Sequence, residues 1–522
     1  MDAAGPVVEE RRVLTLLAAD LVGSTAVGEV LDPEEARLVV GGAVARMVAA
    51  VEALGGTVKD LAGDGVFCLF GAPVAHEDDP ERAVRAGLRI AETIAAYAEE
   101  VECGWGVRGF GVRVGVATGA VVVGPIGAGG RVEYGATGDA ANTAARLQAA
   151  AEPATVLVDE ATRRLVEPLF AWGEPRSLRL KGKERPVLAT PALSVLAAIP
   201  ERRLDAPLVG RERELATARD ALADVLAGTG GVLFVTGEPG IGKSRLLAEL
   251  RREFASASSA GGRPLWLEGQ AASYSDTVPY ALFRNLLGSW LELPAGQPEL
   301  RVRVALRRTL EGLFGVEGAA LEPQLAVLLG LEVEEASLGR RPQTVRQRVV
   351  AAVETLLARL ARDGPVVVAL DDVQWADPSS LELLDRLLAL PDREPILLAL
   401  AQRIELAHPS WELRQQALRT VPHRTREVSL APLPEEADAE LLAALVEHGT
   451  IPDELASRLL TAAGGNPFFL EELVHSLRDA GALVRAEGRW RVDRDVELTV
   501  PESVQSVVLA RLDRLPAPAR NL

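Results

Sequence analysis

The chain has 522 residues, of which 48% are hydrophobic, and its formal net charge at pH 7 is -18. This length exceeds what one hydrophobic core supports and predicts about three domains. The acidic balance, with no block rich in lysine and arginine, lacks the positive footprint of a nucleic-acid binder. The two cysteines, Cys68 and Cys103, exclude a disulfide framework and a thiolate metal site.

The start of the chain and its apolar stretches predict a soluble cytoplasmic protein without membrane contact. The first ten residues are acidic, so no secretory leader is expected. Arg46 interrupts the longest early apolar stretch, and no stretch approaches the length that crosses a bilayer.

After a tail at residues 1–12, the first part of the chain mixes short strands with helices. Strands are expected at 13–19, 57–62, 66–70, 112–118, 120–123, 156–158, 177–181 and 186–189, and helices at 33–54, 79–99 and 140–150. The strands 57–62 and 66–70 flank Gly63-Asp64-Gly65 and form a hairpin. The mixed order predicts an α+β sandwich with a largely antiparallel sheet over residues 13–190.

A proline-containing linker is expected at 191–207, and a different pattern follows it. Strands at 232–236, 366–370 and 396–401 alternate with helices, which predicts a parallel α/β core over residues 208–432. The pattern then turns helical, so a helical lid is expected at 433–500. Residues 501–522 are expected to start a further helical or winged-helix domain, apparently truncated.

The first strand of this second part runs into a glycine-rich loop, in the strand-loop-helix context of a P-loop. The loop is Gly237, Glu238, Pro239, Gly240, Ile241, Gly242, Lys243 and Ser244. Its glycines let backbone amides converge on phosphate oxygens, and the following helix adds partial positive charge. Lys243 is expected to reach the outer phosphates of ATP, and Ser244 to bind Mg²⁺.

Polar residues follow the next two strands. Asp371 is predicted to hold Mg²⁺ through water as a Walker B carboxylate, and Asp372 to polarise the attacking water. Arg403 is either a sensor of the outer phosphate or a surface residue.

Three further motifs make this part resemble the signalling AAA/STAND-type ATPase module. They are Leu208-Val209-Gly210-Arg211-Glu212, LDDVQWAD at 370–377 and GGNPFFLEEL at 464–473. The resemblance covers roughly residues 207–500 and implies a nucleotide-controlled regulator with ATPase activity. It also implies a protein regulator that acts through this module or through a missing C-terminal region.

The first part carries its own pattern for phosphate chemistry. Asp20 ends a strand and Asp64 lies in the hairpin, so their carboxylates can converge on a pair of divalent cations. The turn after Asp20, with Gly23, Ser24 and Thr25, is expected to present backbone amides to a triphosphate.

Asn142 and Arg146 lie four residues apart on a predicted helix and therefore share one face. One supplies an amide, and the other supplies a planar positive group that suits a phosphate.

Four motifs in this order resemble class III nucleotidyl cyclases, especially bacterial and ATPase-linked forms. They are LAADLVGST at 17–25, GTVKDLAGDGVFCLF at 56–70, YGATGDAANTAARL at 134–147 and LRLKGK at 178–183. The resemblance spans roughly residues 12–190 and implies a ferredoxin-like sandwich that works as a homodimer. It implies a two-metal reaction that makes 3′,5′-cyclic AMP and pyrophosphate from ATP, regulated by the fused ATP-binding module.

The same resemblance implies a role for each site residue. Two Mg²⁺ or Mn²⁺ ions would lie at Asp20, Leu21 and Asp64, while Asn142 orients the ribose, Arg146 stabilises the α-phosphate and Lys181 contacts the polyphosphate. Metals and Asn/Arg would come from different copies of the domain, which is why a homodimer is implied.

The positions that select the base depart from the family pattern. Asp60 stands where adenylyl cyclases often carry lysine and guanylyl cyclases glutamate, and Gly135 falls at the second position. Asp60 can accept a hydrogen bond from adenine or from guanine, so a cyclase that uses GTP is an alternative to the favoured ATP.

Two other readings compete with an active cyclase. The cyclase-like domain could be a weak or inactive sensor or dimerisation module of an ATPase regulator. A transcription regulator built on the ATPase would need a DNA-binding element, which this sequence lacks.

Overall fold

The computed structural model describes residues 10–126, 133–179, 186–196, 207–257, 264–275, 278–293, 297–333, 342–406, 408–447, 449, 451–479, 481–486 and 489–492. The chain divides into two compact units, and the boundary between them in the sequence falls between residues 200 and 201. The segment predicted at 501–522 lies outside the described residues.

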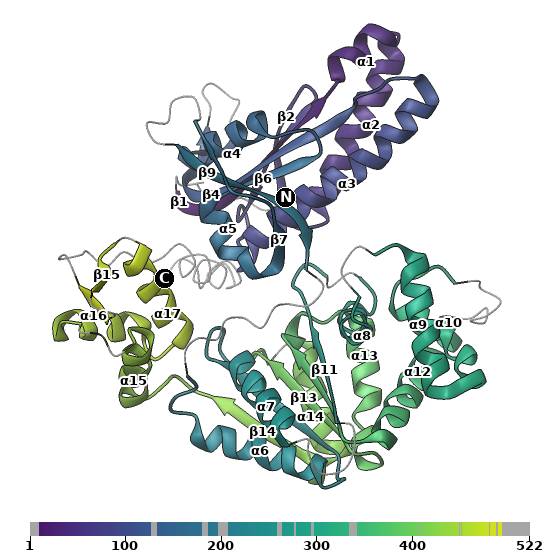
Figure 1. Cartoon of the computed structure of the whole chain (residues 1–522), viewed down its shortest axis with the longest axis vertical. Helices are drawn as coiled ribbons and strands as arrows, with labels where there is room; N and C mark the ends of the chain where they lie inside the picture. The colour runs from purple at the N-terminus through teal and green to yellow at the C-terminus, as the bar shows by residue number, and fades with distance from the viewer. Residues whose placement is uncertain are drawn as a thin grey trace, which may run out of the picture. The chain divides into compact units, whose positions relative to one another are not determined.

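The first unit is built on a mixed sheet (Figure 1). Its strands are β1 (Glu10–Val22), β2 (Thr57–Ala62), β3 (Gly65–Phe70), β4 (Gly111–Ile126), β5 (Glu133–Thr137), β6 (Thr155–Asp159), β7 (Phe170–Trp172), β8 (Arg176–Leu178) and β9 (Val187–Val195). Its helices are α1 (Ser24–Val30), α2 (Pro33–Glu52), α3 (Asp79–Trp105), α4 (Asp139–Ala150) and α5 (Glu160–Val166).

The sheet has the order β2-β3-β1-β4-β6-β9-β7, with β5 on β4 and β8 on β9. Among the first four of these strands, β2, β3, β1 and β4, each adjacent pair is antiparallel. With α2 and α3 as the connecting helices, they form the ferredoxin-like β-α-β-β-α-β arrangement that the sequence predicts. β4 and β6 are parallel, so the sheet is mixed beyond this core.

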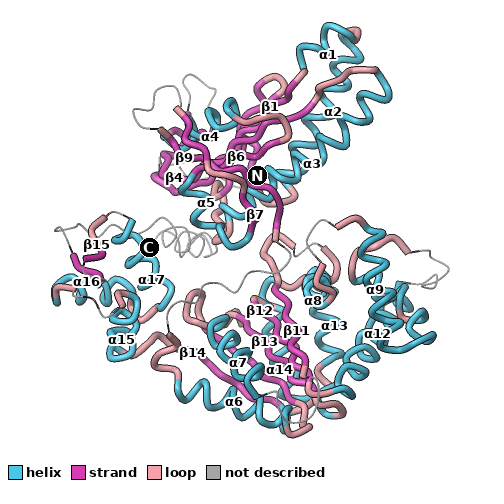
Figure 2. The backbone as a smooth tube through the Cα atoms, in the orientation of Figure 1, coloured by secondary structure: helices cyan, strands magenta, loops and turns pink. Residues whose placement is uncertain are grey.

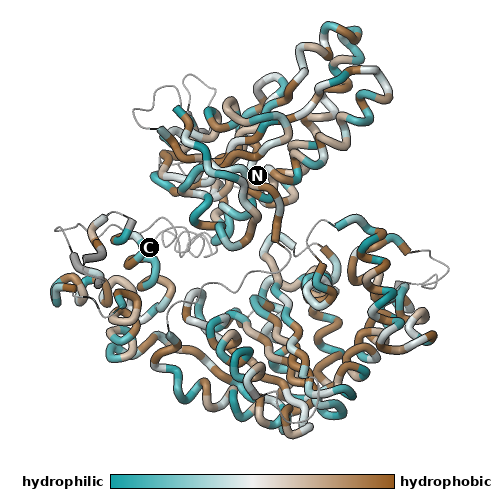
Figure 3. Tube along the Cα trace, in the orientation of Figure 1, coloured by the Kyte–Doolittle hydropathy of each residue, from teal (hydrophilic) through white to brown (hydrophobic). Residues whose placement is uncertain are grey.

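Alternation along β1 and β4 divides the side chains between two helical layers. Leu14, Leu16 and Ala18 pack with α4 in one buried cluster. On the opposite face, α3 packs closely against β4. The approach is so close that a Cβ at Gly87 would meet the side chain of Val114. Charged and apolar residues alternate along the helices that cover the sheet (Figure 3).

Two expectations for the first unit are wrong in detail. The strands predicted at 112–118 and 120–123 are one strand, β4, because Gly119 pairs with Leu14 and does not turn the chain. The linker predicted from Pro191 begins inside β9, where Pro191 pairs with Leu157. Its carbonyl still accepts a hydrogen bond from Gly173 at 2.9 Å, so this proline is compatible with the sheet.

A buried polar network joins β1, β4 and α5. Asp159 is the N-cap of α5 and accepts hydrogen bonds from the backbone N–H groups of Thr162 at 2.9 Å and Thr118 at 3.4 Å. The Thr118 hydroxyl also contacts the hydroxyls of Thr15 at 2.9 Å and Thr162 at 2.7 Å. Burial raises the pKa of Asp159 to about 6, although these hydrogen bonds oppose the shift.

The second unit contains a parallel sheet of order β11-β12-β13-β10-β14, as the alternating pattern predicts (Figure 2). The strands are β10 (Gly231–Gly237), β11 (Leu265–Gln270), β12 (Val366–Asp371), β13 (Ile396–Gln402) and β14 (Thr425–Leu430). The surrounding helices are α6 (Glu212–Leu226), α7 (Lys243–Ala257), α8 (Ala281–Trp290), α9 (Glu299–Phe314), α10 (Glu322–Leu328), α12 (Pro342–Asp363), α13 (Pro378–Leu387) and α14 (Pro409–Thr420).

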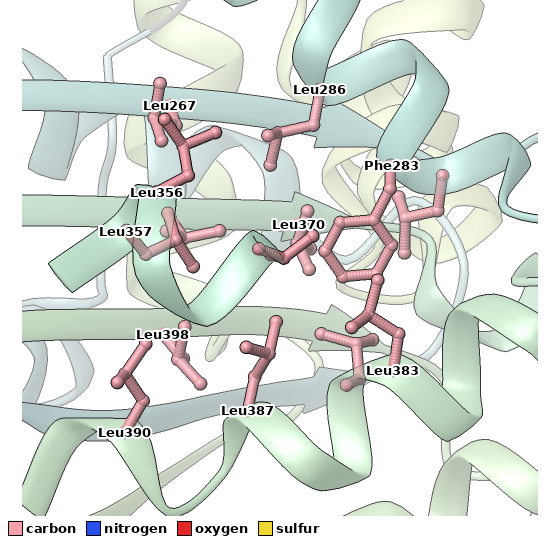
Figure 4. Close-up of a cluster of buried hydrophobic side chains, with 14 of the residues drawn as sticks. Leu267, Phe283, Leu286, Leu356, Leu357, Leu370, Leu383, Leu387, Leu390 and Leu398 are labelled. Carbon is pink, nitrogen blue, oxygen red and sulfur yellow. The ribbon is translucent and has the colours of Figure 1, made fainter. Parts of the chain in front are cut away.

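Both faces of this sheet are covered, which explains why its three inner strands, β10, β12 and β13, are almost continuously apolar and buried. α6 and α7 cover one face, against Leu233, Val235 and Ala399. The other face packs on α8, α12 and α13, where leucines surround Phe283 (Figure 4).

The region after the sheet contains α15 (Glu435–Leu445), α16 (Asp453–Ala463) and α17 (Pro467–Asp479). We call these three helices the lid. A purely helical region is not what the structure shows, because β15 (Leu483–Ala486) and β16 (Arg489–Val492) form an antiparallel hairpin after α17. Across the described parts of both units, no helix combines the length and hydropathy of a membrane span.

We predict that Asp159→Asn makes the stability of the first unit less dependent on pH. A raised pKa means that the folded state holds this proton more tightly than the unfolded state, so stability falls as the pH rises towards 6. The loss is on the order of 1 kcal/mol between about pH 5 and pH 7.5. Asparagine keeps the oxygen that accepts both N–H groups, so calorimetry should show a smaller change of melting temperature between these two pH values.

The matched control is Glu174→Gln, which removes an exposed carboxylate from the same unit. An unchanged pH dependence in Asp159→Asn would show that this carboxyl group is not the cause.

Candidate functional site

Two carboxylates meet at one end of the first unit's sheet. Asp20 lies near the end of β1 and pairs with Gly65 of β3. Asp64 lies in the two-residue turn between β2 and β3, where Gly63 takes a positive φ of 67°. The turn returns the chain beside β1, so the two carboxyl groups are close enough for a hydrogen bond.

The pKa of Asp20 is raised from its ordinary value. Burial contributes most, and the charge of Asp64 and the hydrogen bond with it add to the shift. The positive charge of Arg113 acts in the opposite direction. Two like charges held together in this way favour a proton or a cation between them.

Arg113 is a residue that the sequence reasoning missed. It pairs with Asp20 across β1 and β4, so both side chains lie on the same sheet face. Its Nε atom is buried and has no hydrogen-bond acceptor among the described residues. The signal for its role is strand register, which is set between residues far apart in the sequence.

The turn expected after Asp20 is shorter than predicted. β1 continues through Leu21 and Val22, which pair with the start of β4, and α1 begins at Ser24. Only Gly23 remains between them, with φ 81°, and a Cβ there would lie 2.8 Å from the carbonyl oxygen of Gly109. Thr25 therefore belongs to the first turn of α1.

α4 carries Asn142 and Arg146 on its side away from the sheet. Its buried side holds Ala140, Ala144 and Leu147. No described hydrogen bond or ion pair joins Asn142 or Arg146 to Asp20 or Asp64 within one chain; the described bond of Asn142 is a long one of 3.5 Å to the carbonyl of Gly138.

A glycine in β4 sets the distance between α4 and the sheet. A Cβ at Gly115 would lie 2.3 Å from the carbonyl oxygen of Ala144 and from the backbone nitrogen of Gln148. Only a residue without a side chain permits this approach.

The two predicted base-selecting positions lie at opposite ends of the sheet. Asp60 is in β2 and pairs with Phe67 after a register shift that leaves Lys59 as an extra residue. Gly135 is in β5 and pairs with Gly124 of β4. At about 3.3 Å per residue, Gly124 lies roughly 36 Å along β4 from Arg113.

Lys181 lies outside the described residues. The ammonium of Lys59 lies 5.6 Å from the centre of the Phe67 ring.

In the second unit, the predicted phosphate loop runs from the end of β10 to the start of α7. The ammonium of Lys243 is buried and donates hydrogen bonds to the carbonyls of Gly237 and Glu238, both at 3.0 Å. The lysine therefore folds back over its own loop, where its charge is partly satisfied.

Asp371 lies beside the loop at the end of β12. Ser244 donates a hydrogen bond to its carboxyl group, so the two predicted Mg²⁺ ligands are in contact. The pKa of Asp371 is raised to about 6, mainly by burial and then by the charge of Asp372. Ser244 and Lys243 oppose this shift.

Asp372 takes a left-handed conformation, with φ 55°, and glutamine amides hold both of its oxygens. Gln270 donates to one at 3.0 Å and Gln374 to the other at 2.8 Å. Both oxygens of the carboxylate that is predicted to polarise the attacking water therefore already accept hydrogen bonds from amide groups. Gln270 is a second residue that the sequence reasoning missed.

Of the two interpretations of Arg403, the surface residue is wrong, because the residue is buried. It is 9% exposed, and its backbone N–H donates to the Oε1 atom of Gln374 at 3.1 Å. Its guanidinium lies 5.3 Å from the centre of the Trp375 ring. Trp375 is thereby a packing partner of Arg403.

Comparisons with known families divide the chain in the same way. Residues 7–189 match the adenylate and guanylate cyclase catalytic domain, and residues 207–399 match an AAA ATPase domain. Residues 434–491, which include the lid, match a domain of unknown function.

Several bacterial proteins are similar in sequence. An uncharacterized protein of Rhizobium meliloti is 32% identical over 471 residues, which are 89% of this chain and 44% of that protein. Adenylate cyclase 1 of the same organism is 33% identical over 138 residues, 26% of this chain and 21% of its own length. An uncharacterized protein of Mycobacterium tuberculosis is 32% identical over 190 residues, 35% of this chain and 33% of that protein. The chain thus spans less than half the length of these relatives.

Solved structures also resemble part of the chain. The guanylyl cyclase Cya2 is 30% identical, with 38% of this chain and 97% of that chain covered and a TM-score of 0.34. The adenylyl cyclase CyaB from P. aeruginosa is 25% identical, with 38% and 98% covered and a TM-score of 0.35. By the two family matches, the chain carries an adenylate and guanylate cyclase catalytic domain followed by an AAA ATPase domain.

Proposed function

We propose that the first unit converts ATP to 3′,5′-cyclic AMP and pyrophosphate and that the ATPase domain regulates this reaction. The observation that supports the proposal most is the contact between the carboxyl groups of Asp20 and Asp64, beside the guanidinium of Arg113. This places two anionic oxygen ligands and one cation on the sheet face where a metal-bound triphosphate can lie.

The donor set fits Mg²⁺ or Mn²⁺. Mg²⁺ is usually held by one or two carboxylates, with water and substrate phosphates completing its shell. Asp20 and Asp64 supply two carboxylates that lie within hydrogen-bond reach of each other. The backbone of Leu21, next to Asp20, is the further protein ligand in this proposal. Two bound ions would supply Lewis acidity at the ribose 3′-oxygen and at the triphosphate.

The protein's own groups position and neutralise the substrate. Attack of the ribose 3′-oxygen on the α-phosphorus forms one P–O bond, breaks the bond to the β-phosphate and releases pyrophosphate, while the hydroxyl proton passes to solvent. Arg146 stabilises charge on the α-phosphate, and Asn142 orients the ribose. Arg113 and Lys181 neutralise the remaining phosphates, and the backbone at Gly23, Ser24 and Thr25 borders them.

The layout of a single chain supports a homodimeric site. Asp20 and Asp64 lie at one end of the sheet, whereas Gly135 lies roughly 36 Å away along β4. Asn142 and Arg146 point away from the sheet face that holds the carboxylates. A second copy in two-fold symmetry would bring these groups to the carboxylates of the first copy, and the reverse, to give two equivalent sites.

ATP is the proposed substrate. The relative named adenylate cyclase 1 supports this choice. Asp60 of β2, which lies opposite Phe67 of β3, can accept a hydrogen bond from the amino group of adenine. GTP is the alternative, since the same carboxylate can accept from N1–H and the amino group of guanine.

The second unit is proposed to bind ATP with Mg²⁺. The contact between Ser244 and Asp371 supports a metal position next to the loop. The glutamine amides on Asp372 favour slow hydrolysis, which suits a regulatory module more than a fast ATPase.

A second candidate function is a nucleotide sensor or dimerisation module without cyclase activity. The unusual pair Asp60 and Gly135 favours it, because glycine offers no side chain to read a base.

We predict that Asp20→Ala and Asp64→Ala each lower cyclic AMP formation more than about a hundredfold, because each removes half of the carboxylate pair. Nucleotide binding at Lys243 should survive in both. The measurement is chromatography of cyclic product, pyrophosphate and phosphate after incubation with ATP or GTP and Mg²⁺ or Mn²⁺.

The matched control is Lys243→Ala, which should abolish nucleotide binding in the second unit and leave Asp20 and Asp64 in place. Wild-type protein that forms dimers but no cyclic product would favour the sensor. Loss of both activities in every variant would contradict two separate sites.

We predict that Asp20→Ala and Arg146→Ala complement each other when mixed. Each mixed dimer contains one intact site, because Asp20 and Arg146 of that site come from different chains. Random pairing of equal amounts should restore about one quarter of the wild-type activity. A mixture no more active than its components would show that each site is built within one chain.

We predict that Mg²⁺-dependent nucleotide binding by the second unit weakens as the pH falls below about 6. The pKa of Asp371 is raised to about 6, so the carboxyl group gains a proton and loses its affinity for the cation below that pH. Isothermal calorimetry with ADP at several pH values, with Mg²⁺ and with EDTA, isolates the metal-dependent part. Asp371→Asn should remove that part at every pH, and a pH effect that persists in this variant would assign it elsewhere.

A further inference from the structure

The phosphate loop of the second unit is held from outside by the lid and by the segment before α6. Three successive carbonyls, at 239–241, accept hydrogen bonds from groups that do not belong to the loop. The bonds are from Asn466 Nδ2 to Pro239 at 3.0 Å, from Phe468 N–H to Gly240 at 3.3 Å and from Arg211 Nη2 to Ile241 at 3.3 Å. Two of the three donors, Asn466 and Phe468, come from the lid, which we take to include the turn between α16 and α17.

The side chain of Asn466 makes hydrogen bonds both to its own helix, α17, and to the phosphate loop. Its Oδ1 atom accepts from the backbone N–H groups of Phe468 at 3.1 Å and Phe469 at 3.4 Å, so it caps the start of α17. Its amide nitrogen is then directed to the carbonyl of Pro239. The side chain is 9% exposed, so this bond is largely protected from water.

The two glycines before Asn466 place it at this position. Gly464 ends α16 in a left-handed conformation with φ 58°, and Gly465 follows with φ 74°. The carbonyl of Gly465 accepts from the N–H of Leu433 at 2.8 Å, which ties the turn to the end of the sheet region. The GGNP sequence therefore forms a rigid turn against the loop.

The contact between lid and loop is close. Gly240 has φ 75°, and a Cβ there would lie 2.8 Å from the Oδ1 atom of Asn466 and 2.8 Å from the Cβ of Phe468. The lid could not dock in this way on a loop with a side chain at this position.

Fixing a carbonyl also fixes the N–H group of the same peptide plane, which points the opposite way. The bonds to 239–241 therefore hold the N–H groups of residues 240–242 directed away from these contacts, as an anion-binding loop requires. Among them, the N–H of Ile241 donates a long hydrogen bond of 3.4 Å to the carbonyl of Glu238 within the loop. We propose that Asn466 is a positioning residue that couples lid docking to nucleotide affinity: the docked lid holds the phosphate loop in its binding shape, and bound nucleotide strengthens lid docking. This coupling rests on the proposed binding of nucleotide at the P-loop, and the two effects must be reciprocal.

The test uses the full 522-residue chain with Asn466→Ser and Asn466→Ala. Serine caps helices about as well as asparagine, so its hydroxyl can still accept a hydrogen bond from the backbone N–H groups in the first turn of α17. Its side chain is too short to replace the hydrogen bond to the carbonyl of Pro239. Both variants should bind a fluorescent ADP with Mg²⁺ about five- to tenfold more weakly, since one buried hydrogen bond to the loop is lost. The melting temperature of Asn466→Ser without nucleotide should stay close to that of the wild type.

A second readout separates coupling from simple destabilisation. In the wild type, added nucleotide should slow hydrogen exchange of the backbone in α16 and α17, and this slowing should be largely lost in Asn466→Ser. The matched control is Thr461→Ala, which removes an exposed hydrogen bond to Ser457 in the same lid, away from the loop. It should keep both the affinity and the nucleotide-dependent slowing.

The outcomes are distinguishable. Equal affinity and equal slowing in the wild type and Asn466→Ser would overturn the coupling alone. Equal binding by the wild type and Lys243→Ala would overturn nucleotide binding at the P-loop, and the coupling with it.

Discussion

The antiparallel pairing of β1 with β4 positions the carboxylates and the arginine of the candidate cyclase site, and the helix that carries Asn142 and Arg146. Both strands are long, and their register places Asp20 opposite Arg113 at one end and Glu10 opposite Val123 at the other. The hairpin that carries Asp64 pairs with the same β1, and α4 packs on the same face of both strands. Because side chains alternate along a strand, a shift of β1 by one residue against β4 would place Asp20 on the sheet face opposite to that of Arg113.

Both units also share an electrostatic constraint. Each places two acidic groups side by side: Asp20 with Asp64, and Asp371 with Asp372. In both pairs, burial and the neighbouring charge raise the pKa of one carboxyl group, and a nearby cationic side chain offsets part of the effect. Such pairs are costly in an empty site and become favourable when a divalent cation joins them, which links metal binding to local stability.

Much of this architecture could be predicted from the sequence, because the signals are local. The P-loop between a strand and a helix, the hairpin around Asp64 and the α4 helix are all recognisable from consecutive residues. The features that escaped prediction depend on contacts between distant segments. Arg113 becomes informative only once its register against Asp20 is known, and Gln270 only once β11 lies beside β12.

Glycine and proline were the least reliable guides for the same reason. Gly119 was interpreted as a break, but a Cβ there would lie 3.2 Å from the Cβ of Ala140, so the residue serves the approach of α4. Pro191 was interpreted as part of a linker, but it is accommodated within β9. In both cases tertiary packing decided the meaning of a residue whose local preference pointed elsewhere.

The position of Lys243 has a consequence for which small molecules the second unit can distinguish. Its ammonium is already bonded to two carbonyls of its own loop, so a ligand must offer enough negative charge to replace them. A nucleoside monophosphate, with its single short anionic group, compensates this exchange less well than a di- or triphosphate. For the nucleotide binding proposed at this loop, we therefore expect discrimination by the length of the phosphate chain before any contact with the base.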